Sequence, residues 1–484
     1  MSLDHDDSGQ HSVRKENEAR IFDYRPTPLD ACSIETCSGQ CLQWQSSESE
    51  TSEYENSIVA HIPMCLGCYQ LDKTTGTRQG QLDLYAIPVV KNTSREQSSR
   101  RYSIQSFGDD KDNPPLTICG GTTSKVSGIL DGKWCPTPYQ RQSELSFENY
   151  YATAHASGEI MIHNIFADGA TISDINTKTR NPFQAKFAGK TTQEELSVAD
   201  PNSPCLCLAI AWDQSCNNGN DAIPLNTRII SSYSDGNAAI HQIQQSSSGN
   251  VELSTSLEHC WPAHKMFNSP SEVWCCAFLS INNNDNTTYP TNIVATGGDE
   301  GCWKMWDLRT NLSRPIYHNT NAFDAGVTVL SPHPRQSNLL VVGSYDETIA
   351  LYDVRYVSSS SSPTSLFHSD AIGGGIWRCK WHPKDDNRLL IAAMHGGCRI
   401  VQFADHLVAP QGRKCDHDAG SEIPIQFHSV FTEHKSMAYG CDWLVYPNDA
   451  IVAGKKDEVV EAAVSCSFYD QTMYLWSAPI TDSI

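Results

Sequence analysis

The chain has 484 residues, 39% of them hydrophobic, and a formal net charge of −21 at pH 7. That length allows two or three domains or one large β-propeller. The negative charge argues against a general binder of nucleic acid or of membrane surfaces, and fits either simple solubility or a cationic partner. No apolar run approaches the ~20 residues of a membrane span. The polar, acid-rich start shows no secretory signal, so we expect a cytoplasmic protein.

The 19 cysteines indicate reduced thiols in such a compartment. Cys65-Leu-Gly-Cys68 has a CxxC spacing, but no second pair follows at zinc-finger distance. The pair also lies between apolar residues of an expected strand. We therefore predict buried thiols here and no metal or cofactor site.

Taken in order, the chain begins with residues 1–20, whose composition predicts a disordered tail. Ile21–Pro28 is expected to be a lone strand, and Ala31–Cys37 the innermost strand of a first unit. Further pairs of apolar segments give seven units in all, ending with Ala462–Trp476. Polar stretches between them predict loop insertions near 45–56, 91–115, 176–203, 355–366 and 404–426.

The segment Leu339–Arg355 shows the repeated unit most clearly, because two apolar runs flank the polar turn Ser344–Thr348. Related hairpins recur along the chain. Aligned on their turns, they place one residue each at the end of the hairpin: Tyr85, His163, His241, Trp306, Tyr352, Phe403 and Trp476. In five units a polar residue lies six positions earlier: Ser157, Asp235, Glu300, Asp346 and Asp470.

This periodicity predicts an all-β fold, a seven-bladed WD40-type β-propeller with loop insertions, formed by residues 21–484 as one domain. The last unit has strands for only part of a blade, and Ile21–Pro28 has no partner. We therefore expect the N-terminal strand to complete the last blade and close the ring.

From the fourth unit onward the ordered motifs GGDEGCWKMWDLR, GSYDETIALYDVR, GGGIWRCKWHP, AAMHGG, AYGCDW and SFYDQTMYLW resemble the diphthine methylesterase family, the WD-repeat proteins of the diphthamide pathway. FDYRPTPLDACSIETC and MCLGCYQL…GQLDLYA match the opening blade of that family, and the resemblance covers most of residues 21–478. It implies a carboxylic ester hydrolase whose partner is translation elongation factor 2. The implied reaction removes the methyl ester of methylated diphthine on that factor and gives diphthine, ready for amidation.

Hydrolysis of an ester needs a nucleophile or an activated water, a base, and donors to the oxyanion. The chain contains neither a Gly-x-Ser-x-Gly nucleophile elbow nor a His-Glu-x-x-His motif. Candidate catalytic residues therefore lie on blade turns: Ser344 and Asp346 on one, and His395 on its counterpart in the next blade. The alternative is a structural hydrogen-bonding role, which the repeated turn position favours for Asp346 and Asp470. No repeat rule demands a histidine at His395, where both roles stay open.

The substrate that the resemblance implies carries a quaternary ammonium, a group that aromatic faces bind. Trp377 and Trp443 lie near the starts of the last two inner strands, and Tyr345 and Tyr469 lie on turns. With the acidic side chain of Asp442, they are candidates for a substrate-binding pocket. Packing between blades is the alternative.

Fold alone does not decide function, and a non-catalytic WD-repeat scaffold remains the second hypothesis. A third is a ubiquitin-ligase substrate adaptor. It is suggested by WDxR-like ends at Trp306–Arg309 and Tyr352–Arg355, which could dock another protein on the propeller surface.

Overall fold

The computed structural model describes residues 20–37, 42–43, 58–91, 102–104, 116–120, 126–136, 147–167, 181–191, 205–213, 227–245, 252–280, 291–355, 362–408, 423–445 and 461–477. In these ranges the named elements are strands, apart from the four-residue helix α2 (Asp405–Val408). No helix in this part of the chain has the length and apolar character to cross a bilayer.

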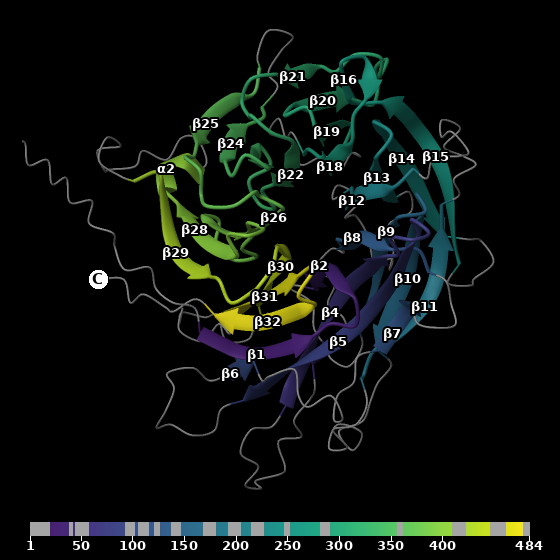
Figure 1. Ribbon diagram of the computed structural model, residues 1–484, viewed down its shortest axis with the longest axis vertical. Coiled ribbons are helices and arrows are strands. Elements are labelled where there is room, and N and C mark those ends of the chain that lie inside the picture. The colour runs from purple at the N-terminus through teal and green to yellow at the C-terminus, as the bar shows by residue number, and fades with distance from the viewer. Residues whose placement is uncertain are drawn as a thin grey trace, which may run out of the picture.

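Seven antiparallel sheets of the described ranges form a ring of blades (Figure 1). The first strand of each blade is the innermost, and these inner strands contact one another around a central channel. Blade 1 contains β2 (Asp30–Thr36), β4 (Ile58–Leu71) and β5 (Arg78–Lys91), with the short strands β3 (Leu42–Gln43), β6 (Tyr102–Ile104) and β7 (Leu116–Gly120) paired to β4 or β5.

Blades 2 to 6 are four-stranded sheets that pair in sequence order. Blade 2 is β8 (Ile129–Trp134), β9 (Phe147–His155), β10 (Ile160–Ala167) and β11 (Gln184–Lys190); blade 3 is β12 (Cys207–Trp212), β13 (Thr227–Tyr233), β14 (Asn237–Gln245) and β15 (Leu253–Pro262). Blade 4 is β18 (Val273–Phe278), β19 (Ile293–Gly298), β20 (Trp303–Asp307) and β21 (Tyr317–Asn319). Blade 5 is β22 (Val327–Pro332), β23 (Leu339–Ser344), β24 (Ile349–Asp353) and β25 (Thr364–His368); blade 6 is β26 (Arg378–Trp381), β27 (Arg388–Ala392), β28 (Cys398–Phe403) and β29 (Ile425–Phe431). The short hairpin β16 (Lys265–Met266) and β17 (Ser269–Pro270) connects blades 3 and 4.

Blade 7 closes the ring with strands from both ends of the chain. It consists of β30 (Ala438–Val445), β31 (Glu461–Ser467), β32 (Thr472–Ser477) and β1 (Arg20–Pro26). In the pairing of β1 with β32, Ile21 lies opposite Trp476 and Tyr24 opposite Tyr474. The predicted seven-bladed fold and its closure by the N-terminal strand are therefore confirmed.

The seven residues aligned from the sequence at the hairpin ends all lie on third strands of blades: β5, β10, β14, β20, β24, β28 and β32. Four ranges expected as loop insertions contain, in addition, β6, β11, α2 or the starts of β25 and β29. These outer strands are half-exposed, as in β11, so they lack the apolar alternation that marks the buried strands. The range 45–56 and all of the predicted tail except Arg20 lie outside the described residues.

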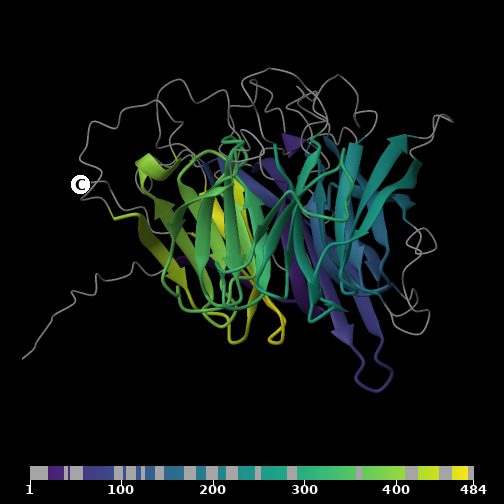
Figure 2. The ribbon, with the colours of Figure 1, turned by 90° about the horizontal axis from the view of Figure 1, so that it is seen from above.

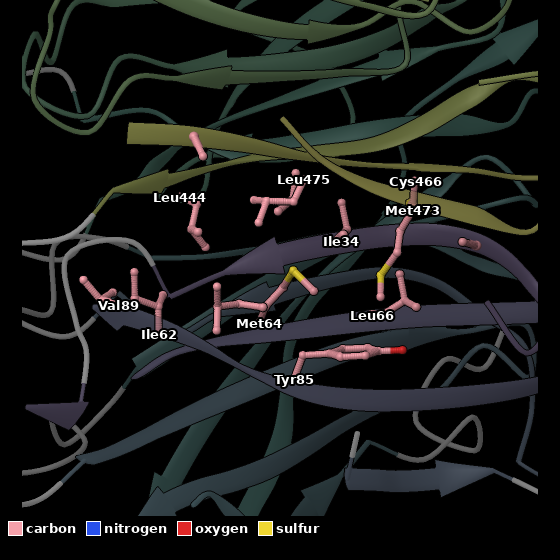
Figure 3. Close-up of a cluster of buried hydrophobic side chains, with 14 of the residues drawn as sticks. Ile34, Ile62, Met64, Leu66, Tyr85, Val89, Leu444, Cys466, Met473 and Leu475 are labelled. Atoms are coloured by element: carbon pink, nitrogen blue, oxygen red, sulfur yellow. The ribbon is translucent and has the colours of Figure 1, made fainter. Parts of the chain in front are cut away.

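Apolar side chains fill the space between neighbouring blades. At the closure of the ring, Ile34 and Met64 of blade 1 pack with Leu444 and Leu475 of blade 7 (Figure 3). All four are buried, with at most 1% of their surface exposed. This cluster anchors the terminal strands by burying apolar surface as well as by backbone pairing.

Four tryptophans near the ends of inner strands fasten one blade to the preceding one. Each donates its indole N–H to a backbone carbonyl of the neighbouring inner strand, and we call these contacts the indole clasps. They are Trp134 to Glu35 (3.2 Å), Trp212 to Lys133 (3.0 Å), Trp381 to Ser331 (3.1 Å) and Trp443 to Lys380 (2.9 Å). Because a buried indole N–H needs an acceptor, each clasp fixes both the spacing and the register of two blades.

A second repeated device lies inside blades 4 and 7. In blade 4, His264 Nε2 is 2.8 Å from Thr296 Oγ1, which also accepts the indole N–H of Trp306. In blade 7, His434 and Trp476 share Ser465 in the same way. These His–hydroxyl–Trp chains resemble catalytic triads, but all their histidine and tryptophan side chains are buried and serve the packing of the blade.

Replacing Trp212 by Phe is expected to lower the free energy of unfolding by about 1–3 kcal/mol, because the carbonyl of Lys133 loses its buried donor. Trp261→Phe is the matched control, since the buried indole N–H of Trp261 has no partner among the described residues. Urea unfolding of both variants measures the difference. An equal loss in the two variants would contradict a specific role for the clasp.

Acid is expected to destabilise the fold between pH 6.5 and about pH 4. Burial lowers the pKa of five histidines from 6.5 to about 4: His61, His155, His163, His241 and His434. Across this interval the unfolded chain binds protons that the folded chain does not, so the free energy of unfolding falls as the pH falls. Each histidine contributes up to about 1.4 kcal/mol per unit of pKa difference. Thermal unfolding as a function of pH measures this slope, which His434→Gln should make shallower.

Candidate functional site

One face of the propeller carries most of the candidate residues. It is formed by the turns between second and third strands and by the starts of the inner strands, which pair with the ends of the second strands, as Val327 does with Ser344. We call it the turn face; the β4–β5 turn projects from it in Figure 2. Tyr345, His395 and Tyr469 lie on three of its turns.

Aromatic rings form a continuous arc on the turn face. Trp377, directly before β26, stacks on Tyr439 of β30 with ring centroids 4.8 Å apart and planes 22° apart. On one side the arc continues through Trp274, 5.8 Å from Trp377. On the other side Phe468 lies 4.9 Å from Tyr439 and 4.7 Å from Tyr469. We call these five residues the aromatic arc.

The contact between Trp274 and Trp377 shows where the arc lies. The two residues belong to blades 4 and 6, which are separated by blade 5. Their contact therefore passes across the mouth of the central channel. The indole N–H of Trp274 donates to Asp299 Oδ1 at 2.9 Å, which fixes the ring in this orientation.

Tyrosine hydroxyls gather around the same point. Tyr345 and Tyr469 are 52% and 65% exposed. Burial raises the pKa of Tyr439, and the neighbouring side chains of Tyr469, Cys32 and Tyr345 add to the effect. The Tyr439 hydroxyl therefore stays protonated at neutral pH. Apart from Phe468, which is buried, the rings of the arc and of Tyr345 are partly exposed, and aromatic faces attract cations.

His395 lies on the turn next to this arc and is exposed. The preceding residue, Met394, is buried and has a φ of 41°, a conformation that bulky residues rarely adopt. Its carbonyl accepts the N–H of Ala438, the residue before Tyr439, at 3.0 Å. Gly374 completes the arrangement, because a Cβ there would clash with the carbonyl oxygen of Ala393. The turn with His395 is thus fixed between the segments that carry Trp377 and Tyr439.

Ser344 and Asp346 have the contacts of a structural turn. Ser344 is fully buried, and its hydroxyl donates to the Ala325 carbonyl at 3.0 Å. Asp346 accepts hydrogen bonds from the N–H groups of Thr348 (3.0 Å) and Asp324 (2.8 Å). No hydrogen bond within the described ranges joins either residue to His395. This geometry favours turn stabilisation over nucleophilic or base chemistry for both.

Asp442 and Trp443 lie away from the arc, within β30. Asp442 is buried and accepts the N–H of Thr36 at 2.8 Å, so it joins blade 7 to blade 1. Burial raises the pKa of this carboxyl to about 6, although Lys380 opposes the shift. Trp443 forms the clasp to Lys380 and is 1% exposed. Both residues connect neighbouring blades, and the structure does not bring them to the aromatic arc.

Within the channel, charged side chains of the inner strands pair across the ring. Lys133 contacts Glu35 at 2.7 Å and Asp131 at 2.8 Å, and Arg378 reaches Asp131 at 3.2 Å. Lys380 bonds to Glu35 as well. Burial opposes ionisation of Asp131, but Lys133 and Arg378 outweigh it and lower the pKa of the carboxyl. A cavity of about 250 Å³ beside this network is lined by inner strands of blades 2 to 6.

Sequence reasoning missed three members of the arc: Trp274, Tyr439 and Phe468. A signal was present, because Trp274 and Tyr439 occupy the second position of their inner strands. Trp377 lies at the corresponding point beside β26. The recurrence of an aromatic residue at the start of inner strands becomes visible only when the sequences of the blades are aligned with one another. It then indicates a group of rings at the channel mouth.

The described residues hold no cluster of three or more His, Cys, Asp or Glu side chains placed to bind a metal ion. Cys65 and Cys68 are buried in β4, as predicted. Burial raises the pKa of both thiols, which keeps them protonated and unreactive.

No protein-family model matches the chain. A protein named diphthine methyltransferase homolog from Dictyostelium discoideum is 31% identical over 281 residues, covering 56% of this chain and 62% of that protein. The mouse diphthine methyltransferase is 28% identical over 359 residues, with 74% and 61% covered. The protein of that name from Saccharomyces cerevisiae is 23% identical over 460 residues, covering 88% of this chain and 98% of its own length.

The chain thus spans about three fifths of the Dictyostelium and mouse proteins and nearly all of the yeast protein. Among solved structures, a chain of the mitotic checkpoint complex aligns over 99% of this chain and 97% of its own, with 12% identity and a TM-score of 0.48, too distant to bear on function. Several diphthine methyltransferases align with this chain at 22–31% identity and together match most of its sequence, so the chain is a homologue of the diphthine methyltransferases.

Proposed function

We propose that this protein hydrolyses the methyl ester of methylated diphthine on translation elongation factor 2. The observation that carries the proposal is the aromatic arc at the channel mouth, with exposed Tyr345 and Tyr469 and the turn of His395 beside it. Aromatic faces suit the quaternary ammonium of the modified histidine, at about 0.5–2 kcal/mol for a good contact. A side chain on a protein surface can reach rings that are exposed to solvent, as those of Tyr345 and Tyr469 are.

The chemistry assigned to the site is water attack on an ester. In this proposal His395 accepts a proton from a water molecule whose oxygen attacks the ester carbonyl carbon. The proton then passes to the departing methoxide oxygen, which leaves as methanol, and the carboxylic acid that forms releases its remaining proton to solvent and becomes a carboxylate. The protonated hydroxyl of Tyr439 is a candidate donor to the oxyanion. Ser344 and Asp346 would hold the neighbouring turn in place.

The name of the relatives describes an enzyme that adds a methyl group to diphthine, whereas the proposed hydrolysis removes one. A single experiment separates the two reactions. The purified protein is incubated with elongation factor 2 carrying methylated diphthine, and methanol release is measured beside the mass of the modified peptide. Loss of one methyl group with equimolar methanol supports hydrolysis, whereas no turnover above a boiled control would refute it.

A non-catalytic scaffold or ubiquitin-ligase adaptor is the second candidate. The observation in its favour is that Asp307-x-Arg309 and Asp353-x-Arg355 end the third strands of neighbouring blades with the same geometry. In each pair the arginine bonds back to its own aspartate, and Arg309 remains 66% exposed. A stable complex that is lost in Arg309→Ala, together with absent esterase activity, would favour this candidate.

His395→Ala is expected to lower kcat for ester hydrolysis by roughly 10²–10⁴-fold, the usual contribution of a general base. Asp346→Asn should change kcat less than threefold, because its role is to accept hydrogen bonds within the turn. Steady-state methanol release measures both variants, and circular dichroism checks that they fold. Equal losses in the two variants would argue against a base at His395.

Trp377→Ala is expected to raise KM for the factor by roughly 2–30-fold, the equivalent of one cation–π contact. Tyr24→Ala is the control, because Tyr24 is 51% exposed and lies on the outer strand β1, away from the arc. Tetramethylammonium should inhibit the wild type competitively, whereas the uncharged isostere tert-butanol should not. Identical inhibition by the two compounds would show that the site does not recognise the positive charge, and would contradict the proposed cation–π contact.

A further inference from the structure

The hairpin β16–β17 presents an aromatic side chain to solvent at its tip. Phe267 is 95% exposed, and the two residues of the turn, Phe267 and Asn268, have φ values of 49° and 69°. Two positive φ values define the tight turn that suits β-hairpins, and Asn-Gly is the preferred pair there. An aromatic residue at the first of these positions is a steric outlier.

Phe267 therefore carries two unfavourable features at once, a disfavoured backbone conformation and an exposed apolar ring. Folding of the hairpin gives no reason for either, because Asn at this position would satisfy the turn and tolerate water. Strained residues that the surrounding structure maintains are concentrated at functional positions. Exposed aromatic side chains are also typical anchors of protein interfaces.

The base of the hairpin is held firmly. The N–H groups of Ala263 and His264 donate to the carbonyl of Gly236 at 2.8 and 3.0 Å. The His264 ring is fixed by Glu300 Oε1 at 2.7 Å and by Thr296. The tip is thus presented on a rigid support, so little conformational freedom remains to be lost on binding.

The hairpin lies on the turn face, because it leads into the start of β18 and thus to Trp274 of the aromatic arc. Figure 1 shows β16 toward the outer edge of the ring, between β15 and β21. A partner that contacts both Phe267 and the channel mouth must therefore extend from the centre of the face to its edge. A protein can do this, and a small molecule cannot.

The charge of the face selects the partner. Segments 234–236, 263–272, 299–302, 320–326, 345–348, 369–377, 393–397, 432–437 and 468–471 form the turn face of blades 3 to 7. They contain ten carboxylates against Lys265 and Lys435, a formal charge of −8 (two minus ten), which Lys304 and Arg399 reduce to −6 because their side chains bind Glu300, Gly373 and Gly396 in these segments. The carboxylates are Asp235, Glu272, Asp299, Glu300, Asp324, Asp346, Glu347, Asp370, Glu433 and Asp470. Such a face attracts a basic protein surface and repels an acidic one.

We propose that Phe267 is a docking residue that inserts into an apolar pocket, rimmed by basic side chains, on the protein substrate. This inference rests on the proposed function for the identity of that substrate, elongation factor 2. The hairpin tip contributes to recognition of the whole protein, whereas the aromatic arc and His395 act on the modified side chain alone.

The test compares Phe267→Asn with Asn268→Gly in the full-length protein. Phe267→Asn should weaken binding of the whole factor at least tenfold and raise KM by the same factor, with kcat unchanged. Thermal stability should stay the same or rise, because Asn fits the turn. Asn268→Gly eases the turn but keeps the phenyl ring, and should bind like the wild type. Phe187→Asn, a substitution of a 52% exposed residue on β11, is a second control.

A short peptide with the modified histidine separates this inference from the proposed function. Phe267→Asn should cleave the peptide at the wild-type rate, since the peptide cannot reach the hairpin. If the wild type releases methanol from neither substrate, the proposed function fails, while calorimetric binding of the factor still tests the docking. Equal affinity of the wild type and Phe267→Asn for the factor, or no binding by the wild type, would overturn the docking role.

Discussion

The indole clasps are the interaction on which the rest of this structure depends. A propeller blade pairs its own strands through backbone hydrogen bonds, but only isolated ones, such as that from Ala438 to the Met394 carbonyl, join neighbouring blades, so side chains must help to specify how the blades meet. Trp212 and Trp443 supply that specification, because an indole N–H buried between blades must find the carbonyl of the neighbouring inner strand. Apolar side chains stabilise the interface, and the clasps set its register.

The charged side chains in the channel also help to set the position of the blades relative to one another. Asp131 and Arg378 are 247 positions apart in the sequence, yet they pair at 3.2 Å across the ring. Taking such charges out of water is costly, and pairing offsets that cost only when the geometry is accurate. The ring must therefore be closed and correctly spaced for these buried charges to be paired. Their pairing fills part of the channel and holds the inner strands of the blades rigidly in place.

The candidate site inherits its geometry from this support. Trp377 of the arc and Trp381 of a clasp are four positions apart along one inner segment, and Tyr439 and Trp443 have the same relation on the next. One end of each strand is fastened to the preceding blade, and the other end presents an aromatic ring at the channel mouth. Stacking of Trp377 on Tyr439 thus depends on two clasps about 13 Å further along the strands, at roughly 3.3 Å per residue.

The sequence by itself determined the seven hairpins, the residues at their ends and the closure by the N-terminal strand. The hairpins and their ends are encoded locally, in apolar alternation and in turn residues such as Asp346, whose hydrogen bonds reach only a few positions or the adjacent loop. The closure follows from counting strands, because the last unit lacks one and the N-terminal strand lacks a partner. Only the tertiary structure decided which candidates meet. It brought Trp274 to Trp377 from non-neighbouring blades and kept Asp442 and Trp443 in the joints between blades. The physical reason is that contacts across the channel depend on the closed ring, which no period within a single strand or hairpin can specify.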